Sequence, residues 1–144
     1  MFLFSQPAWK HISLSKQETR TKRIDAAVGG LRKQSVGDGE TSAEDEKYLR
    51  ATATEIVQSI SEGKWLAEDV AAAYVRRAAR VQQLHNPITE VLFSEALEQA
   101  KALDKEFART GKIKGPLHGV PVSIKDQFEV EGVDTTVGFS AWCN

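Results

Sequence analysis

A serine and a lysine stand two residues apart near the end of the sequence, and their types could support nucleophilic catalysis. Ser123 and Lys125 alternate with Val122 and Ile124, and residues two apart share one face of a β-strand. A lysine amine serves as a base only in its neutral form, which burial and hydrogen bonding must favour. The pattern therefore fits either a Ser–Lys pair inside a catalytic site or the solvated face of an edge strand. Alternation alone favours the edge strand.

Other groups of reactive residues carry a weaker signal. Ser123, His118 and Asp126 include the residue types of a hydrolase triad, but along one strand they are too close to adopt triad geometry. The remaining histidines, His11 and His85, form no helical metal-ligand spacing with each other or with His118. The glycine motifs that bind nucleotide phosphates are absent from the sequence. The residues therefore predict neither a metal nor a nucleotide cofactor.

Three amphipathic helices are predicted ahead of these residues, because apolar side chains recur there with helical spacing. The helices span residues 52–61, 67–84 and 95–109. Ser42 or Thr52 is expected to cap the first helix and Ser94 the third. Leu66 precedes the second helix and has no side-chain acceptor, so the sequence supplies no local cap there.

The segments around these helices are predicted to be extended or irregular, with one further helix. Residues 16–28 form a short helix in this interpretation, and the glycine-rich and acidic stretch 29–46 is a connector. Residues 88–93 read as a short strand or extended stretch, and residues 120–126 as a strand. Helices followed by strands are typical of the front of an α/β domain.

Composition and charge exclude several classes of protein. The chain has 144 residues, a net charge of −1 and 41% hydrophobic residues, which argues against a generally basic nucleic-acid-binding protein. Its apolar runs fall short of the roughly 18 residues that a membrane span needs. The single cysteine, Cys143, excludes an internal disulfide and a cysteine-based zinc site. We therefore expect a cytoplasmic protein with no membrane span and no nucleic-acid partner.

Basic residues are concentrated at the N-terminus. The first 35 residues hold seven lysines and arginines against two acidic residues. Such a segment can be an organellar transit peptide or a solvated leader, and the interrupting acids and few serines favour the leader. We therefore expect a partly disordered leader and linker over residues 1–43 and a folded part over residues 44–144.

The segment 115–126 reads GPLHGVPVSIKD and resembles the start of the amidase signature family. Residues 127–132 and 134–138 agree with that family in type and spacing, as do short segments between residues 77 and 104. The upstream segments resemble the fungal acetamidase-like branch in particular. The similarity covers about residues 44–142.

This resemblance implies a hydrolase of carboxamides that works through a Ser–cis-Ser–Lys triad. Lys125 matches the lysine of the triad, Ser123 is not a triad member, and Asp126 is expected to be a local structural partner. Because serine and lysine supply the nucleophile and the base, no cofactor is expected, and the substrate would be a small amide. The implied fold is α/β, with N-terminal helices leading into the first strands of the family's mixed sheet, here truncated.

The resemblance also limits what this stretch can do alone. Both family serines lie in and beyond a Gly-Ser-rich stretch after the lysine, and this sequence contains no Gly-Gly-Ser-Ser segment. We therefore expect the N-terminal portion of an amidase that is inactive by itself. The alternatives are a non-catalytic binding or regulatory module derived from an amidase, and a truncated gene product. The sequence carries no signal for an oligomeric state.

Overall fold

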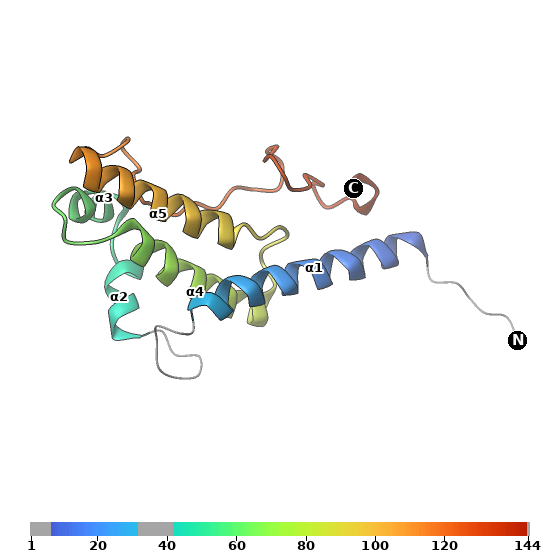
Figure 1. Ribbon diagram of the computed structural model, residues 1–144. Helices are drawn as coiled ribbons and strands as arrows, with labels where there is room; N and C mark the ends of the chain where they lie inside the picture. The colour runs from blue at the N-terminus through green and yellow to red at the C-terminus, as the bar shows by residue number, and fades with distance from the viewer. Residues whose placement is uncertain (1–6, 32–41, 144) are drawn as a thin grey trace, which may run out of the picture.

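The computed structural model describes residues 7–31 and 42–143, and over these residues the protein is helical (Figure 1). Five α-helices are followed by a long irregular segment and one turn of 3-10 helix. The elements are α1 (Ala8–Leu31), α2 (Ala43–Leu49), α3 (Ala53–Ser61), α4 (Ala67–His85), α5 (Phe93–Thr110) and η1 (Ser140–Trp142). No helix of the described part is long and apolar enough to cross a bilayer.

Helix α4 lies at the centre of the fold and packs against α1, α2 and α5. It is rich in alanine, and its small side chains let neighbouring helices approach on several sides. Its fully buried residues Ala67, Val70 and Ala73 join the largest apolar cluster, to which α2, α3 and α5 also contribute. Figure 1 shows α4 between α5 on one side and α1 on the other. The core therefore forms around one helix.

The N-terminal helix belongs to the packed structure. A helix was expected over residues 16–28, and α1 extends beyond it at both ends, through two glycines assigned to the connector. Its buried residues Ile24, Ala27 and Leu31 recur on one face and pack against α4 and the segment that follows α4. This tertiary contact extends the helix beyond what its weak amphipathic pattern predicts. Of the rest of the predicted connector, residues 32–41 lie outside the described residues. Its end was predicted wrongly, because Ser42 caps α2 and residues 43–46 lie in that helix.

The three predicted amphipathic helices are confirmed, with one difference in capping. Thr52 and Glu55 form a reciprocal capping box at the start of α3, and Ser42 caps α2 by accepting the N–H of Asp45. Helix α5 begins at Phe93 with Leu92 at the N-cap, so Ser94 lies inside the helix and is not its cap. The starts of α2 and α3 therefore follow short-range capping rules, whereas the start of α5 does not.

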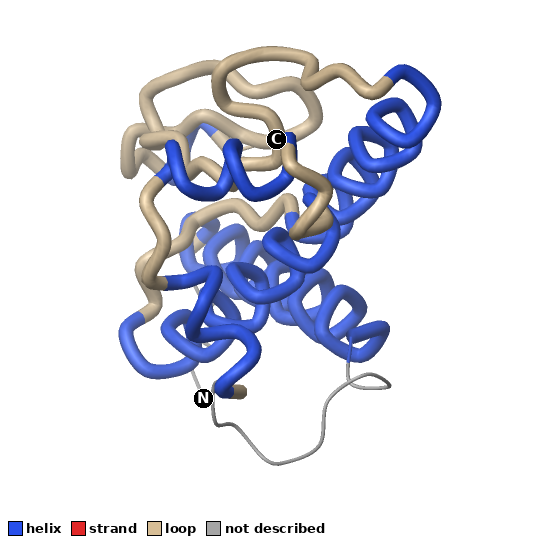
Figure 2. Tube along the Cα trace, turned by 90° about the vertical axis from the view of Figure 1, so that its left-hand side faces the viewer, coloured by secondary structure: helices blue, strands red, loops and turns tan. Residues whose placement is uncertain are grey.

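The predicted α/β fold is wrong, because the described part of the chain contains no β-strand. Residues 120–125 and 88–92 have no regular secondary structure. A strand needs a neighbouring backbone to complete its hydrogen bonds, and no segment of the described chain pairs with residues 120–125. Instead, the carbonyl of Lys125 accepts the N–H groups of Gln127 at 2.7 Å and Phe128 at 3.2 Å, which turns the chain. Figure 2 shows the resulting loops above the helices.

Candidate functional site

Lys125 lies in the irregular segment 120–125, and its side chain is exposed to solvent. The neighbouring side chains do not bury it, because Ile124 is also exposed and the carboxylate of Asp126 is bonded to Thr136. Ser123 is exposed as well. The described residues therefore place the lysine of the predicted triad in water, without the burial that would favour a neutral amine.

The three residue types of the rejected hydrolase triad are held apart by other partners. His118 is buried, its Nδ1 accepts the N–H of Lys114 at 3.0 Å, and its ring lies 6.1 Å from that of Phe107. Its Nε2 has no hydrogen-bond partner within the described ranges. The carboxylate of Asp126 accepts hydrogen bonds from Thr136 rather than from a histidine. His118 therefore serves the packing of the turn ahead of Lys125.

A close backbone contact fixes the chain just ahead of Lys125. Gly119 has a φ of +75°, and a Cβ placed on it would lie 2.9 Å from the Cβ of Ala67. Only glycine allows both the left-handed backbone and this approach. The next residue, Val120, packs against the main apolar cluster. The turn 115–120 is therefore seated directly on the start of α4.

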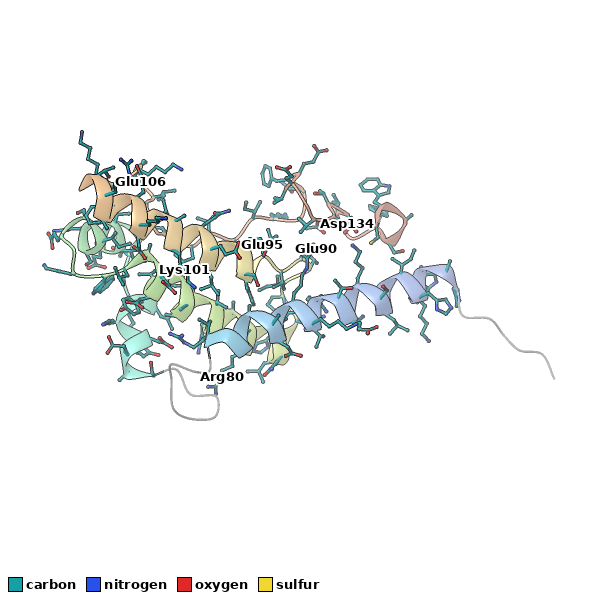
Figure 3. The ribbon with its side chains drawn as sticks, in the orientation of Figure 1. Arg80, Glu90, Glu95, Lys101, Glu106 and Asp134 are labelled. Atoms are coloured by element: carbon teal, nitrogen blue, oxygen red, sulfur yellow. The ribbon has the colours of Figure 1, made fainter. Side chains whose placement is uncertain are left out.

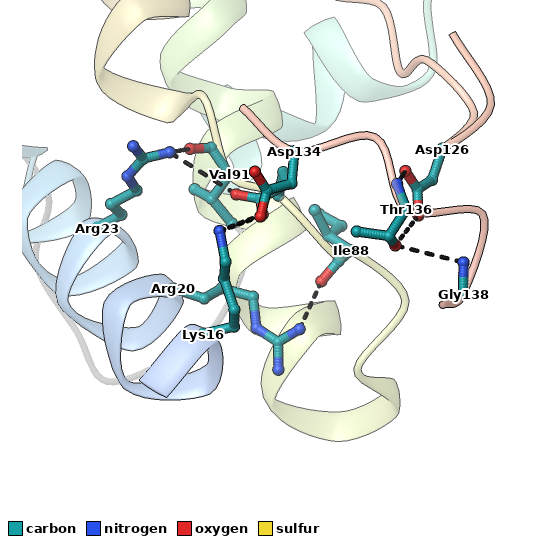
Figure 4. A network of polar contacts seen from close by, with 10 residues as sticks. Lys16, Arg20, Arg23, Ile88, Val91, Asp126, Asp134, Thr136 and Gly138 are labelled. Carbon is teal, nitrogen blue, oxygen red and sulfur yellow. Dashed lines mark hydrogen bonds and ion pairs between the residues drawn. The ribbon is translucent and has the colours of Figure 1, made fainter. Parts of the chain in front are cut away.

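A second set of contacts fixes the chain after Lys125. The carboxylate of Asp126 accepts the N–H and the hydroxyl of Thr136, each at 3.0 Å. The hydroxyl oxygen of Thr136 in turn accepts the N–H of Gly138 at 3.3 Å, as Figure 4 shows. Asp126 is thus a local structural partner, which agrees with the expectation from the sequence. These bonds close residues 126–138 into one loop.

An ion-pair network that the sequence did not reveal joins this loop to α1. Lys16 pairs with the carboxylate of Asp134, and its Nζ also lies 3.7 Å from Glu90. Arg23 lies 3.9 Å from Glu90. Figure 3 shows Glu90, from the connection between α4 and α5, and Asp134, from the C-terminal segment, both on the side of α1 that faces the C-terminal segment. These four side chains, with Thr19 and residues 132–133, line a cavity of about 310 Å³.

The charges of this network affect one another. The hydrogen bond to Asp134, together with the negative charges of Glu90 and Asp134, raises the pKa of Lys16 above its ordinary value. Lys16 is therefore positively charged throughout the physiological pH range, and the two positive charges of Lys16 and Arg23 are balanced by the two carboxylates of Glu90 and Asp134. The cavity thus offers no excess of one charge, which suits a structural contact better than the binding of an ion.

Large apolar side chains are exposed along the same segment. They are Leu117, Val122, Ile124, Phe128, Val137, Phe139 and Trp142. Soluble proteins rarely leave so many apolar residues of one segment uncovered. In the described part of the chain, Lys125 therefore belongs to a segment with many uncovered apolar side chains.

Comparison with known proteins gives a consistent family assignment. The model of the Amidase family matches residues 69–144. The chain is 35% identical to a putative amidase, kk1C, of Curvularia clavata over 97% of its own length and 28% of the relative's. It is 45% identical to an amidase of Gibberella moniliformis over 65% of its length and 17% of the relative's. An acetamidase of Emericella nidulans is 39% identical over 68% of this chain and 18% of the relative.

The matched relatives are much longer than this chain, which spans 28% of the first and 17% of the second. No solved structure matches the chain. The similarity therefore concerns one part of these proteins, and that part includes the segment around Lys125.

Proposed function

This chain belongs to the amidase family, and we propose that it is the N-terminal part of a carboxamide hydrolase in which Lys125 is the catalytic lysine. The observation that carries this proposal is the segment GPLHGVPVSIKD at residues 115–126, which lies within the range matched by the family model. In this proposal residues 44–144 are the N-terminal part of the amidase domain, and residues 1–43 precede it.

The proposed chemistry is acyl transfer through a Ser–cis-Ser–Lys triad. Lys125 takes a proton from the bridging serine, which takes the proton of the nucleophilic serine as that serine attacks the amide carbon. The tetrahedral oxyanion then collapses to an acyl-enzyme as the bridging serine gives a proton to the nitrogen of the leaving amine and regains one from Lys125, and water hydrolyses the acyl-enzyme. Both serines would come from chain that follows Lys125, so residues 1–144 alone are expected to be inactive. The substrate class is a small amide, in keeping with an acetamidase among the relatives.

The surroundings of Lys125 support this proposal. Residues 122–125 are all exposed, and polypeptide that covered both faces of this segment would also remove the Lys125 amine from water. Burial of this kind favours the neutral amine that a base requires. The chain around Lys125 is meanwhile held at both ends, by Gly119 against α4 and by Asp126 against Thr136.

The test uses the native polypeptide that contains this segment, purified from its own cells and assayed for ammonia release from small aliphatic amides. Lys125→Ala should lower kcat by about 10²-fold to 10⁴-fold, the contribution typical of a catalytic base. Lys112→Ala, at an exposed lysine ahead of the turn, is the matched control and should retain activity. An active Lys125→Ala protein would refute the proposed role.

A second outcome would favour a different class of function. If the cells contain only the 144-residue polypeptide and it hydrolyses no amide, the hydrolase proposal fails. The exposed apolar residues between Leu117 and Trp142 would then favour the alternative of a non-catalytic binding or regulatory module derived from an amidase.

A further inference from the structure

One chain of contacts runs from the N-terminal helix to the residue next to Lys125 (Figure 4). We propose that Lys16 of α1 is a positioning residue for the loop of residues 126–138, which begins next to Lys125, and that it acts through Asp134. The N-terminal helix then sets where the Lys125 amine lies, although it belongs to the segment that the sequence assigned to a leader. The effect on catalysis rests on the proposed function. The contact of Lys16 with the loop through Asp134, called the tether below, does not depend on that function.

The first link of this chain is the ion pair between Lys16 and Asp134. The side chain of Asp134 is only 7% exposed and that of Lys16 is 35% exposed, so solvent screens the pair less than it screens pairs on the open surface. Glu90 lies within 4 Å of the same amine, at 3.7 Å, and adds to the attraction. The pair is thus placed to hold one segment against another.

The second link joins Asp134, within the loop of residues 126–138, to Asp126, the residue next to Lys125. Thr136 lies two residues after Asp134 and is bonded through both its N–H and its hydroxyl to Asp126. Asp126 directly follows Lys125. The hydroxyl of Thr135 also donates to the carbonyl of Phe128 at 3.1 Å. Because these hydrogen bonds close the loop, a shift in the position of Asp134 also shifts the backbone beside Lys125.

The anchor at the other end is rigid. Arg20 donates to the carbonyl of Ile88 at 3.0 Å, and Arg23 donates to the carbonyl of Val91 at 3.3 Å. Ile24, one residue further along, is buried in an apolar cluster that includes Val91. Helix α1 is therefore fixed to the segment between α4 and α5 independently of Lys16. Lys16 extends this fixed surface to the loop that carries Lys125.

The helix also offers a matched control. Lys22 pairs with Glu18 at 2.7 Å on the same helix, but the two side chains are 73% and 68% exposed. The pair lies within α1 and reaches no other element. Removing it changes the charge and the helix propensity of α1 as removal of Lys16 does, while it leaves the contact with the loop in place.

The experiment compares Lys16→Ala, Lys16→Arg and Lys22→Ala in the full 144-residue chain by hydrogen exchange and by acetylation, each read by peptide mass spectrometry. In Lys16→Ala, amide exchange in residues 126–138 should rise about tenfold, the ratio that corresponds to ~1.4 kcal/mol. The acetylation rate of Lys125 should change about threefold or more, whereas exchange in α4 should stay unchanged. Lys16→Arg should restore both values, and Lys22→Ala should alter neither.

Three outcomes would overturn the proposal. The first is identical loop exchange in Lys16→Ala and Lys22→Ala, the second is a rise of exchange in α4 as large as that in the loop in Lys16→Ala, and the third is an unchanged acetylation rate of Lys125 in Lys16→Ala. In the native amidase, Lys16→Ala should lower kcat with little change in KM, and Lys16→Arg should restore kcat. If Lys125→Ala leaves hydrolysis intact while the exchange results hold, the proposed function fails and the tether stands.

Discussion

Replacing Asp104 with alanine tests whether a residue of α5 caps the N-terminus of α4. The carboxylate of Asp104 accepts the N–H of Ala67 at 2.7 Å and the N–H of Glu68 at 2.8 Å. Leu66, at the N-cap position, makes no side-chain capping hydrogen bond. The substitution therefore leaves two N–H groups in the first turn of the central helix without their acceptors, and it removes a negative charge from the positive end of the helix dipole.

The expected loss of stability has two parts. Removal of an N-cap acceptor typically costs about 1 kcal/mol of unfolding free energy. Ala67 is 0% exposed, so water replaces the carboxylate poorly at its N–H, and an unsatisfied buried donor adds about 1–2 kcal/mol. We expect Asp104→Ala to lower the free energy of unfolding by about 2–3 kcal/mol and Tm by about 10 °C.

Urea denaturation and thermal melting followed by circular dichroism measure both quantities. Asp104→Asn keeps one acceptor oxygen but no charge, and it should lose about half as much. Lys101→Ala is the matched control, because its amine lies 3.3 Å from Glu68 at the same helix end but is 60% exposed. That substitution should cost about 0.5 kcal/mol or less. If Asp104→Ala is no more destabilising than Lys101→Ala, Asp104 is not the cap of α4.

Two further tests concern other local features. Gly119→Ala should destabilise the protein by about 2 kcal/mol, because the backbone is left-handed and the new Cβ meets Ala67. Gly111→Ala is the control: the backbone is also left-handed but the space around it is open, so it should cost about 1 kcal/mol. Equal losses for the two substitutions would contradict the close approach of residue 119 to Ala67. Hydrogen bonds from Thr52 hold the pKa of Glu55 below its ordinary value of 4.5. The stability that this gives is present above pH 4.5 and is lost as the pH falls through the lowered pKa. Glu55→Gln should therefore reduce the loss of stability below pH 4.5 in denaturation series, and an unchanged pH dependence would argue against the capping box.

The helices could be predicted because the interactions that define them are short. Thr52 and Glu55 are three residues apart, and their capping box depends on that spacing alone. Glycine at position 111 follows α5 in the left-handed conformation that ends helices. The strand prediction for residues 120–126 failed because alternation describes the side chains, whereas a strand also requires a partner for its backbone.

The candidate site divides in the same way. Lys125 was found through the pattern of residues 115–126, and its catalytic role remains a prediction. The sequence indicates nothing of the network around it, because Lys16 and Asp134 lie near opposite ends of the chain and no periodicity links them. Asp134 begins the family-like segment 134–138, but no motif includes Lys16, so only the path of the folded chain brings the two residues together.

The sequence by itself determined where the central helices run and which family the chain resembles, since both depend on residue types at fixed short spacings. The tertiary structure decided which distant residues become partners. The sequence shows that Leu66 leaves α4 without a local cap, and the packing of α5 supplies Asp104. Packing of α1 on α4 likewise brings Lys16 to Asp134. Contacts between distant residues depend on which surfaces are buried together, and that is a property of the whole packed chain.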